Sequence, residues 1–180
     1  MRMKRVSALL FAVALAAPGL AFAADGTVHF EGSVIAPTCV LTNGPTPADI
    51  RVKLPAVAVS ALASAGQVAG RTPFIIRVAD CNAGIGQVQT FFEPGPTIDT
   101  SSNNLTLQGG AGVAGNVQLQ VLNADHSKVL LGNPLGLQNT QSVATEGGAA
   151  ALRYYAQYVA TGAATAGSAN SSVTFTMIYQ

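Results

Sequence analysis

Two cysteines, two histidines and a group of glycines are the residues of this chain whose types and spacing could do chemistry. Gly110, Gly112 and Gly115 spell G-x-G-x-x-G, a dinucleotide-binding pattern. That pattern holds a pyrophosphate only when a helix begins inside it. Here residues 116–121 alternate between polar and apolar, which is typical of a strand. A glycine-rich loop between two strands is therefore expected.

The acidic and histidine side chains form no catalytic or metal-binding pattern. Asp125 and His126 are adjacent and cannot by themselves make a Ser/His/Asp triad, and no G-x-S-x-G nucleophile motif supports one. His29 falls between apolar residues on a polar strand face, and the two histidines and two cysteines lack zinc-ligand spacing. We expect no catalytic residues, no metal and no cofactor. An exported hydrolase is the alternative, and loss of turnover in His126→Ala would support it.

The first residues have the order of a secretory signal peptide. Arg2, Lys4 and Arg5 precede an apolar run at 6–17, and Ala-Phe-Ala ends at Ala23. The run of 12 residues is shorter than the roughly 20 that cross a bilayer as a helix. The pattern predicts a signal peptide at 1–23 and a mature chain of 180 − 23 = 157 residues. That length fits one domain with its own core.

Export decides what the cysteines and charges imply. Removing the signal leaves 9 − 3 = 6 basic and 8 acidic residues, a net charge of −2, so no nucleic-acid partner is expected. Cys39 and Cys81 then lie in an oxidising compartment, where one disulfide is the default inference. Closing a loop of about 40 residues should stabilise the fold by roughly 3 to 4 kcal/mol.

The composition is unusual for a free monomer, because 9% of the residues are charged and 49% are hydrophobic. One explanation is that much of the surface contacts other copies of the chain. The other is that small Ala and Gly residues, and not large apolar ones, lower the polarity. Composition alone leaves both open.

Alternation with period two dominates the chain and predicts strands. Residues 56–66 are rich in alanine and could hold a helical turn or two before Gly66. Gly, Pro, Asn and Asp separate the alternating segments, and this spacing predicts an all-β sandwich in a single domain. The expected strands are 28–36, 49–54, 72–79, 88–93, 105–107, 116–122, 128–131, 152–161 and 172–180.

The last strand has a clear apolar face. Val173, Phe175, Met177 and Tyr179 alternate with threonines and Ile178. On this pattern Tyr179 is interpreted as a core residue with a polar end.

Four segments of the chain form a recognisable combination, namely residues 26–32 leading to Cys39, 70–76 leading to Cys81, 155–163, and 173–180. In this combination the chain resembles the major subunits of type 1-like fimbriae of the chaperone-usher pathway. The ending is the most specific part, because such subunits have a penultimate tyrosine and a glycine fourteenth from the end, here Tyr179 and Gly167. Residues 91–96 also resemble one branch of fimbrial major subunits.

The resemblance implies an all-β, incomplete immunoglobulin-like β-sandwich that lacks its final strand and is completed by a donor strand from a neighbouring subunit. The donor would be the N-terminal extension 24–37, and the pilin domain would be 38–180. A glycine among the inserted residues would suit a tight or shallow pocket. The inserted positions would be Val28, Phe30, Gly32, Val34 and Ala36.

The same resemblance implies the partners. Subunits would join head to tail as a surface fimbria, or pilus, that supports cell adhesion. A periplasmic chaperone would first fill the groove and hold the C-terminal strand, an outer-membrane usher would be the site of exchange, and adaptor and tip adhesin subunits could join the filament. A tip adhesin usually has a further receptor-binding domain, for which 157 residues leave no room. A minor adaptor shares the fold, and abundance would distinguish it. The recognition face would be Gly167, Val173, Phe175, Met177 and Tyr179.

Overall fold

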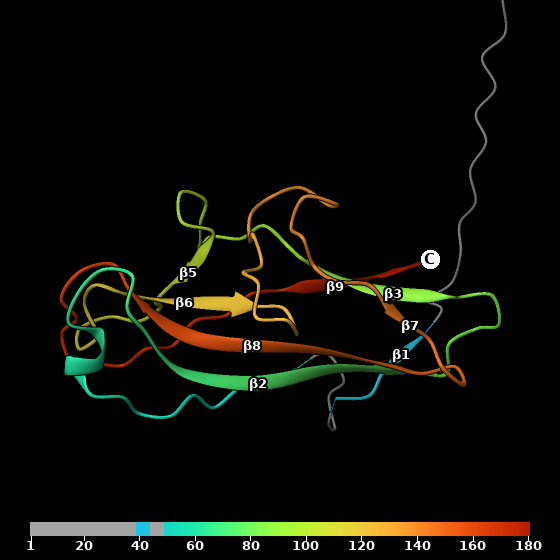
Figure 1. Ribbon diagram of the computed structural model, residues 1–180, viewed down its shortest axis with the longest axis horizontal. Helices are drawn as coiled ribbons and strands as arrows, with labels where there is room; N and C mark the ends of the chain where they lie inside the picture. Colours follow the sequence, from blue (N-terminus) through green and yellow to red (C-terminus); the bar gives the residue numbers. More distant parts are fainter. Residues whose placement is uncertain (1–38, 44–48) are drawn as a thin grey trace, which may run out of the picture. The chain divides into compact units, whose positions relative to one another are not determined.

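The computed structural model describes residues 39–43 and 49–180, and these form a sandwich of two antiparallel sheets (Figure 1). One sheet has six strands and the other has three. The six-stranded sheet has the order β1 (Val40–Leu41), β2 (Val68–Ala79), β8 (Ala150–Ala160), β6 (Val117–Leu122), β5 (Asn104–Thr106) and β4 (Ile98–Asp99). The three-stranded sheet has the order β7 (Val143–Ala144), β3 (Gln87–Phe92) and β9 (Phe175–Tyr179).

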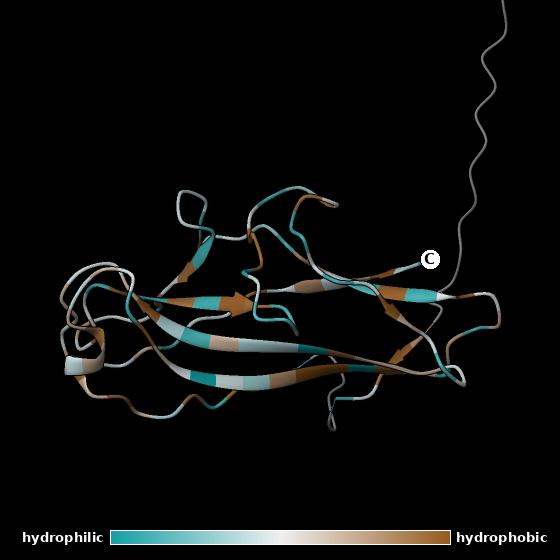
Figure 2. Cartoon of the chain, viewed as in Figure 1, coloured by the Kyte–Doolittle hydropathy of each residue, from teal (hydrophilic) through white to brown (hydrophobic). Residues whose placement is uncertain are grey.

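The alternation seen in the sequence corresponds to an inner and an outer strand face, most clearly in β3. Hydrophobic and hydrophilic residues follow one another along β3 and β6 (Figure 2). In β3, Val88, Thr90 and Phe92 are buried between the sheets. The period of two in β3 therefore has the expected meaning, with one face of the strand buried against the opposite sheet.

The longest ladder joins β2 and β8 and carries a bulge at Gly70. Phe74 lies opposite Tyr154 in this ladder, and the register shifts between Ala69 and Thr72. Gly70 adopts a φ of +68°, and a Cβ at this position would lie 2.9 Å from the ring of Tyr158. A glycine is needed there both for the backbone conformation and for the close approach of the ring.

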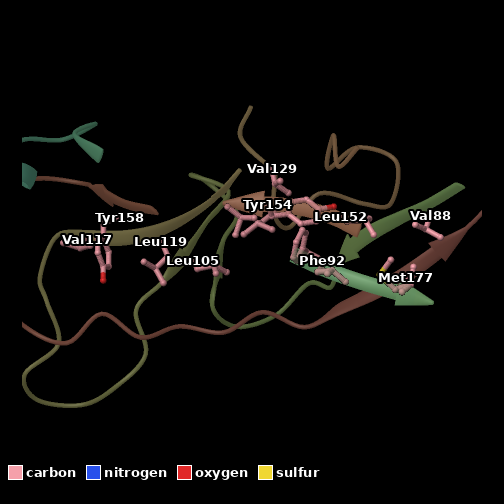
Figure 3. Close-up of a cluster of buried hydrophobic side chains, with 14 of the residues drawn as sticks. Val88, Phe92, Leu105, Val117, Leu119, Val129, Leu152, Tyr154, Tyr158 and Met177 are labelled. Atoms are coloured by element: carbon pink, nitrogen blue, oxygen red, sulfur yellow. The ribbon is translucent and has the colours of Figure 1, made fainter. Parts of the chain in front are cut away.

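Buried side chains form one row between the two sheets. Figure 3 shows this row from Val117 and Tyr158 at one end to Val88 and Met177 at the other. Tyr154 lies in the middle of the row, with ring centroids 5.6 Å from Phe74 and 5.4 Å from Phe92. Such aromatic pairs add to the stability gained by apolar burial alone.

A disulfide closes the beginning of the domain. Cys39 is bonded to Cys81, as expected, and the two lie 42 positions apart in the sequence. The following strand β1 has only two pairs with β2, Val40 with Ala79 and Leu41 with Val78. The bridge therefore attaches the chain before β1 to the C-terminal end of β2 much more firmly than this short ladder could.

A row of side-chain hydrogen bonds crosses the outer face of the larger sheet from Arg71 to Asp99. Every side-chain amide in the row donates its hydrogen bond in the direction of Asp99. The amide dipoles are therefore aligned between the Arg71 cation and the Asp99 anion, and the hydrogen bonds strengthen one another. The bonds are Arg71 Nε to Gln157 Oε1 (2.9 Å), Gln157 Nε2 to Gln120 Oε1 (2.8 Å), Gln120 Nε2 to Asn104 Oδ1 (3.4 Å), Asn104 Nδ2 to Gln118 Oε1 (3.0 Å) and Gln118 Nε2 to Asp99 Oδ2 (2.8 Å).

We expect Asp99 to make part of the stability depend on pH. Hydrogen bonds from the Ser101, Gln118 and Ser102 side chains hold the pKa of Asp99 well below its usual range. A depressed folded-state pKa gives stability that is present above the unfolded-state pKa of about 3.9 and is lost as pH falls toward the folded-state value. Asp99→Asn should lower the melting temperature at about pH 7. The difference in melting temperature between this variant and the unchanged protein should shrink below about pH 4. Thermal unfolding of both proteins should be measured from about pH 2 to about pH 8. This range extends from about 2 units below to about 4 units above the unfolded-state pKa.

The control is Asp49→Asn, which removes an exposed ion pair with Arg51 (3.0 Å) outside the row. Exposed pairs contribute little, so this change should leave the curve nearly unchanged. An Asp99→Asn deficit that stays constant down to pH 2, about 2 units below the unfolded-state pKa, would contradict the prediction.

Two local expectations are confirmed. Residues Val59–Leu62 form the short 3-10 helix η1 in the segment where a helical turn was expected. The G-x-G-x-x-G segment is a loop in which Gly112 adopts a φ of +88°, and the strand β6 follows it.

The strand predicted at 128–131 is wrong. Only an isolated bridge between Lys128 and Leu122 forms there, and the Leu131 N–H donates to the carbonyl of Val129 in a tight turn. Val129 and Leu131 are nevertheless fully buried. Their alternation reflects two side chains that enter the core from a turn, and not a strand.

Candidate functional site

Two extended segments with no strand between them border an open groove in the sandwich. On one side Ile50, Val52 and Leu54 are half-buried, whereas Asp49, Arg51 and Lys53 are exposed. On the other side lie residues 169–175, which lead into β9. Between them is a cavity of about 490 Å³, lined by apolar side chains from both sheets.

A second cavity continues the groove toward η1. Its volume is about 350 Å³, and it shares Leu54 and Ala169 with the first. Small residues line most of it, with Val59 and Leu62 of η1 at its end. The first cavity reaches Leu41 of β1. The two cavities therefore form one groove that runs from the β1 end of the domain to the η1 end.

Both borders of the groove leave backbone groups unpaired. Within residues 39–43 and 49–180, the backbone of residues 50–57 makes no hydrogen bond. On the opposite border the carbonyls of Asn170 and Thr174 accept bonds from outside the groove, from Gln108 N (2.7 Å) and Glu93 N (2.8 Å). In the same described part of the chain, Ala169, Ser171 and Val173 have no backbone bond. Two facing rows of free donors and acceptors are what an added strand requires.

The expected strand at 49–54 and the first residues of the one expected at 172–180 are corrected by this arrangement. Both stretches are extended, but neither is part of a ladder in the described structure. The reason is that a β-strand is defined by its hydrogen bonds to an adjacent strand, and the position between these two stretches is open.

The floor of the groove is apolar and aromatic. Phe74, Phe92 and Phe175 line it, and the first two pack on Tyr154. Asp49 is the only carboxylate among the lining residues in the described part of the chain, and it is ion-paired to Arg51 at the surface. The groove is therefore suited to binding apolar side chains and not to acid or base chemistry.

Comparison with known protein families then decides the identity, because the model of the family described as "FimA: Type-1 fimbrial protein, A" matches residues 54–180. The chain belongs to the type-1 fimbrial protein family. The matched range contains both borders of the groove except for residues 50–53.

Curated relatives of this fimbrial protein cover almost its whole length. It is 46% identical over 169 residues to the major fimbrial subunit SMF-1 of Stenotrophomonas maltophilia (strain K279a), covering 91% of this chain and 98% of the relative. It is 40% identical over 183 residues to the F17 fimbrial protein of Escherichia coli, covering 99% and 100%. The expected family is thus confirmed, and the protein is a structural subunit of an extracellular fimbria.

Solved structures confirm the fold. The P pilus rod subunit PapA superposes with a TM-score of 0.61 at 21% identity, covering 80% of this chain and all of that one. A subunit from a structure of a chaperone-usher pilus superposes with a TM-score of 0.60 at 23% identity, covering 87% and 96%. The fimbrial subunit therefore has the incomplete immunoglobulin-like sandwich of pilus subunits, and the groove marks the missing strand.

The C-terminal residues singled out in the sequence lie along the groove and the adjoining core. Val173 and Phe175 line the groove, and Met177 is buried, where it accepts a hydrogen bond from Thr90 Oγ1 to its sulfur (3.8 Å). Tyr179 is half-buried, and this burial raises the pKa of its phenol. The face assigned from the alternation is thus the inner face of β9. The donor positions Val28, Phe30, Gly32, Val34 and Ala36 lie outside the described residues.

Gly167 lies at the η1 end of the groove, where it meets the glycine-rich loop. A Cβ at this position would collide with Ala114 N and would lie 2.5 Å from Val113 C and 2.7 Å from Gly112 O. These are backbone atoms, which cannot move aside as a flexible side chain can. The fourteenth position from the end therefore needs a glycine for close packing of two loops.

We expect Gly167→Ala to destabilise the fimbrial subunit by at least about 1–3 kcal/mol, the usual cost of overpacking. The matched control is Gly110→Ala in the same loop region, because a Cβ there would have nothing within 4 Å. Urea unfolding of the mature proteins, followed by circular dichroism, measures both. Equal midpoints for the two variants would show that the loops around Gly167 yield easily.

Sequence reasoning missed the opposite border of the groove. Ile50, Val52 and Leu54 were assigned to a strand but not to a binding site, although their alternation with three charged or polar residues was visible. A strand with one apolar face, close after a predicted donor segment, was the signal that could have revealed them.

The remaining polar candidates have structural contacts. Asp125 accepts hydrogen bonds from Ser127 N (2.9 Å), Ser127 Oγ (2.6 Å) and Gln141 Nε2 (2.7 Å). The ring of His126 packs edge-on against Tyr155, with centroids 4.6 Å apart. In residues 39–43 and 49–180, no cluster of His, Cys, Asp or Glu could hold a metal ion. The same part of the chain has no helix long and apolar enough to cross a membrane.

Proposed function

We propose that this fimbrial subunit polymerises by donor-strand exchange, in which the extension 24–37 of one copy fills the groove of the next. The open groove with two unpaired backbone borders is the observation that carries the proposal. An extended chain in this place would pair with both borders and would turn alternate side chains onto the aromatic floor.

The dimensions and chemistry of the extension suit this groove. Val28 to Ala36 would span about 26 Å as a strand, and the border 50–57 about 23 Å. Its apolar residues fall on one side and its polar residues on the other. Burying three or four apolar side chains would stabilise the complex by about 1.5–3 kcal/mol each, before the hydrogen bonds are counted. No nucleotide, metal or catalytic residue is then required, and the subunit acts without enzymatic activity.

The groove also requires protection before assembly, because an open edge over an apolar floor promotes aggregation. We infer that the signal peptide 1–23 directs export and that a periplasmic chaperone fills the groove first. The chaperone recognises the face of Gly167, Val173, Phe175, Met177 and Tyr179. The next subunit's extension replaces it at an outer-membrane usher. Adaptor and tip adhesin subunits join the same filament, which supports adhesion at the cell surface.

The test uses cells that express this chain with its chaperone and usher genes. Material sheared from the surface is run on a denaturing gel, both unheated and boiled. Donor-strand exchange predicts a ladder of multimers that collapses on boiling to one band of the mature size, 180 − 23 = 157 residues. One monomer band in both lanes would contradict it. A shaft role further predicts that this subunit greatly outnumbers any other in the sheared material.

A further inference from the structure

Three large apolar side chains are exposed at the two ends of the groove. Val40 of β1 is 51% exposed, whereas Val59 of η1 is 48% and Val68 of β2 is 46% exposed. Val40 pairs with Ala79, the last residue of β2, and Val68 is the first residue of the same strand. Twelve residues of strand separate the two ends by about 36 Å (Figure 1).

These side chains lie beside the mouths of the groove. Val59 lines the groove at its η1 end, and Leu41, next to Val40, lines it at its β1 end. Both ends of one domain therefore present apolar surface that the domain itself does not cover.

The covalent chain fixes where a donor's body must lie. The extension joins the domain at Cys39, which the disulfide holds to Cys81 at the β1 end. Between Pro37, the last residue of the extension, and Val40 there are three peptide units, which span at most about 11 Å. When a copy's extension fills a neighbour's groove, its Val40 must therefore come within about 11 Å of one end of that groove.

The η1 end is the one available. The β1 end of the acceptor is where the acceptor's own extension leaves toward the next subunit, and a donor body there would obstruct it. With its body at the η1 end, the donor strand runs parallel to residues 50–57 and antiparallel to residues 169–175. The antiparallel orientation relative to residues 169–175 continues the antiparallel pairing of β3 with β9.

We propose that Val59 and Val68 of each subunit form a second contact with the subunit whose extension fills the groove. In that donor subunit the contact is made by Val40 of β1. This contact rests on the proposed strand exchange and extends it from the groove to the joint between domains. The surface formed by Val59, Val68 and the other copy's Val40 is too small to hold two subunits together in isolation. It acts because the inserted strand holds the two surfaces at high effective concentration, which makes the joint stiffer.

The test places the photoreactive residue benzoylphenylalanine at position 40 in the full chain and irradiates assembled fimbriae. The expected product is a dimer that survives boiling, in which residue 40 is joined to the tryptic peptide 54–71, the peptide that contains Val59 and Val68. Fragmentation of the linked peptide locates the attachment site, and because position 40 lies at the opposite end of β2 from Val59 and Val68, a link to either valine must join two copies. The control places the same residue at Leu135, which is 54% exposed in a loop outside both ends of the groove.

Charge variants in the same crosslinking assay test the contact itself. With benzoylphenylalanine kept at position 40, Val59→Glu combined with Val68→Glu should lower the dimer yield several-fold, whereas Val59→Ile combined with Val68→Ile should retain it. An intact unheated ladder with no link to peptide 54–71, or with equal yields from position 135, would overturn the contact and leave strand exchange standing. Absence of the unheated ladder itself would overturn both proposals.

Discussion

Cells that carry Val173→Asp as the sole version of this subunit should produce no fimbriae. Val173 lines the groove and has no backbone partner in the described part of the chain. An aspartate would place an unpaired carboxylate under the inserted strand, at a cost of several kcal/mol. The matched control is Thr174→Asp, which adds the same charge one residue away at an exposed position. Electron microscopy and the unheated gel should show fimbriae for the control alone.

The reciprocal change on the donor side separates giving a strand from accepting one. Phe30→Asp or Val34→Asp should also abolish filaments, but the subunit should still be recovered in a complex with its chaperone, because its own groove is unaltered. Val173→Asp should reduce chaperone binding as well. Normal filaments from the donor variants would refute the assignment of residues 24–37 as donor strand.

Removing the disulfide should have the second large effect. In the chain-entropy model, a loop of this size contributes about 4 kcal/mol to the free energy of unfolding. The double variant Cys39→Ser and Cys81→Ser avoids a lone thiol and should lower the urea midpoint accordingly. The effect on assembly should be larger than this loss of unfolding free energy suggests. Once the disulfide is absent, only the two residue pairs between β1 and β2 hold the start of the domain in place.

Reduced wild-type protein is the control for the serine side chains, and it should unfold at the same urea concentration as the double variant. Fimbriae from the double variant should also be scarce, because the base of the extension is no longer fixed to the domain. An unchanged midpoint would mean that the native fold strains the bridge enough to cancel the entropic gain.

The long strands were predictable because a period of two is a local property of the sequence. β2 contains the alternating segment from which it was predicted, and β3, β6 and β8 overlap theirs to within two residues at each end. The two-residue strands β1, β4 and β7 were not predicted, because two residues carry no periodicity. The turn at 128–131 was misread for the same reason, since alternation reports which side chains are buried and not what the backbone pairs with.

The sequence by itself determined the family, the all-β class, the single disulfide and the apolar face of the last strand. Each of these depends on residue types at fixed spacing along the chain. Tertiary structure alone decided that residues 50–57 and 169–175, more than a hundred positions apart, form the two borders of one groove. It also decided that Gly167 must be a glycine, because the backbone it touches belongs to a loop about fifty residues earlier. Packing between distant segments depends on where the whole chain places them, and local patterns carry no information about that.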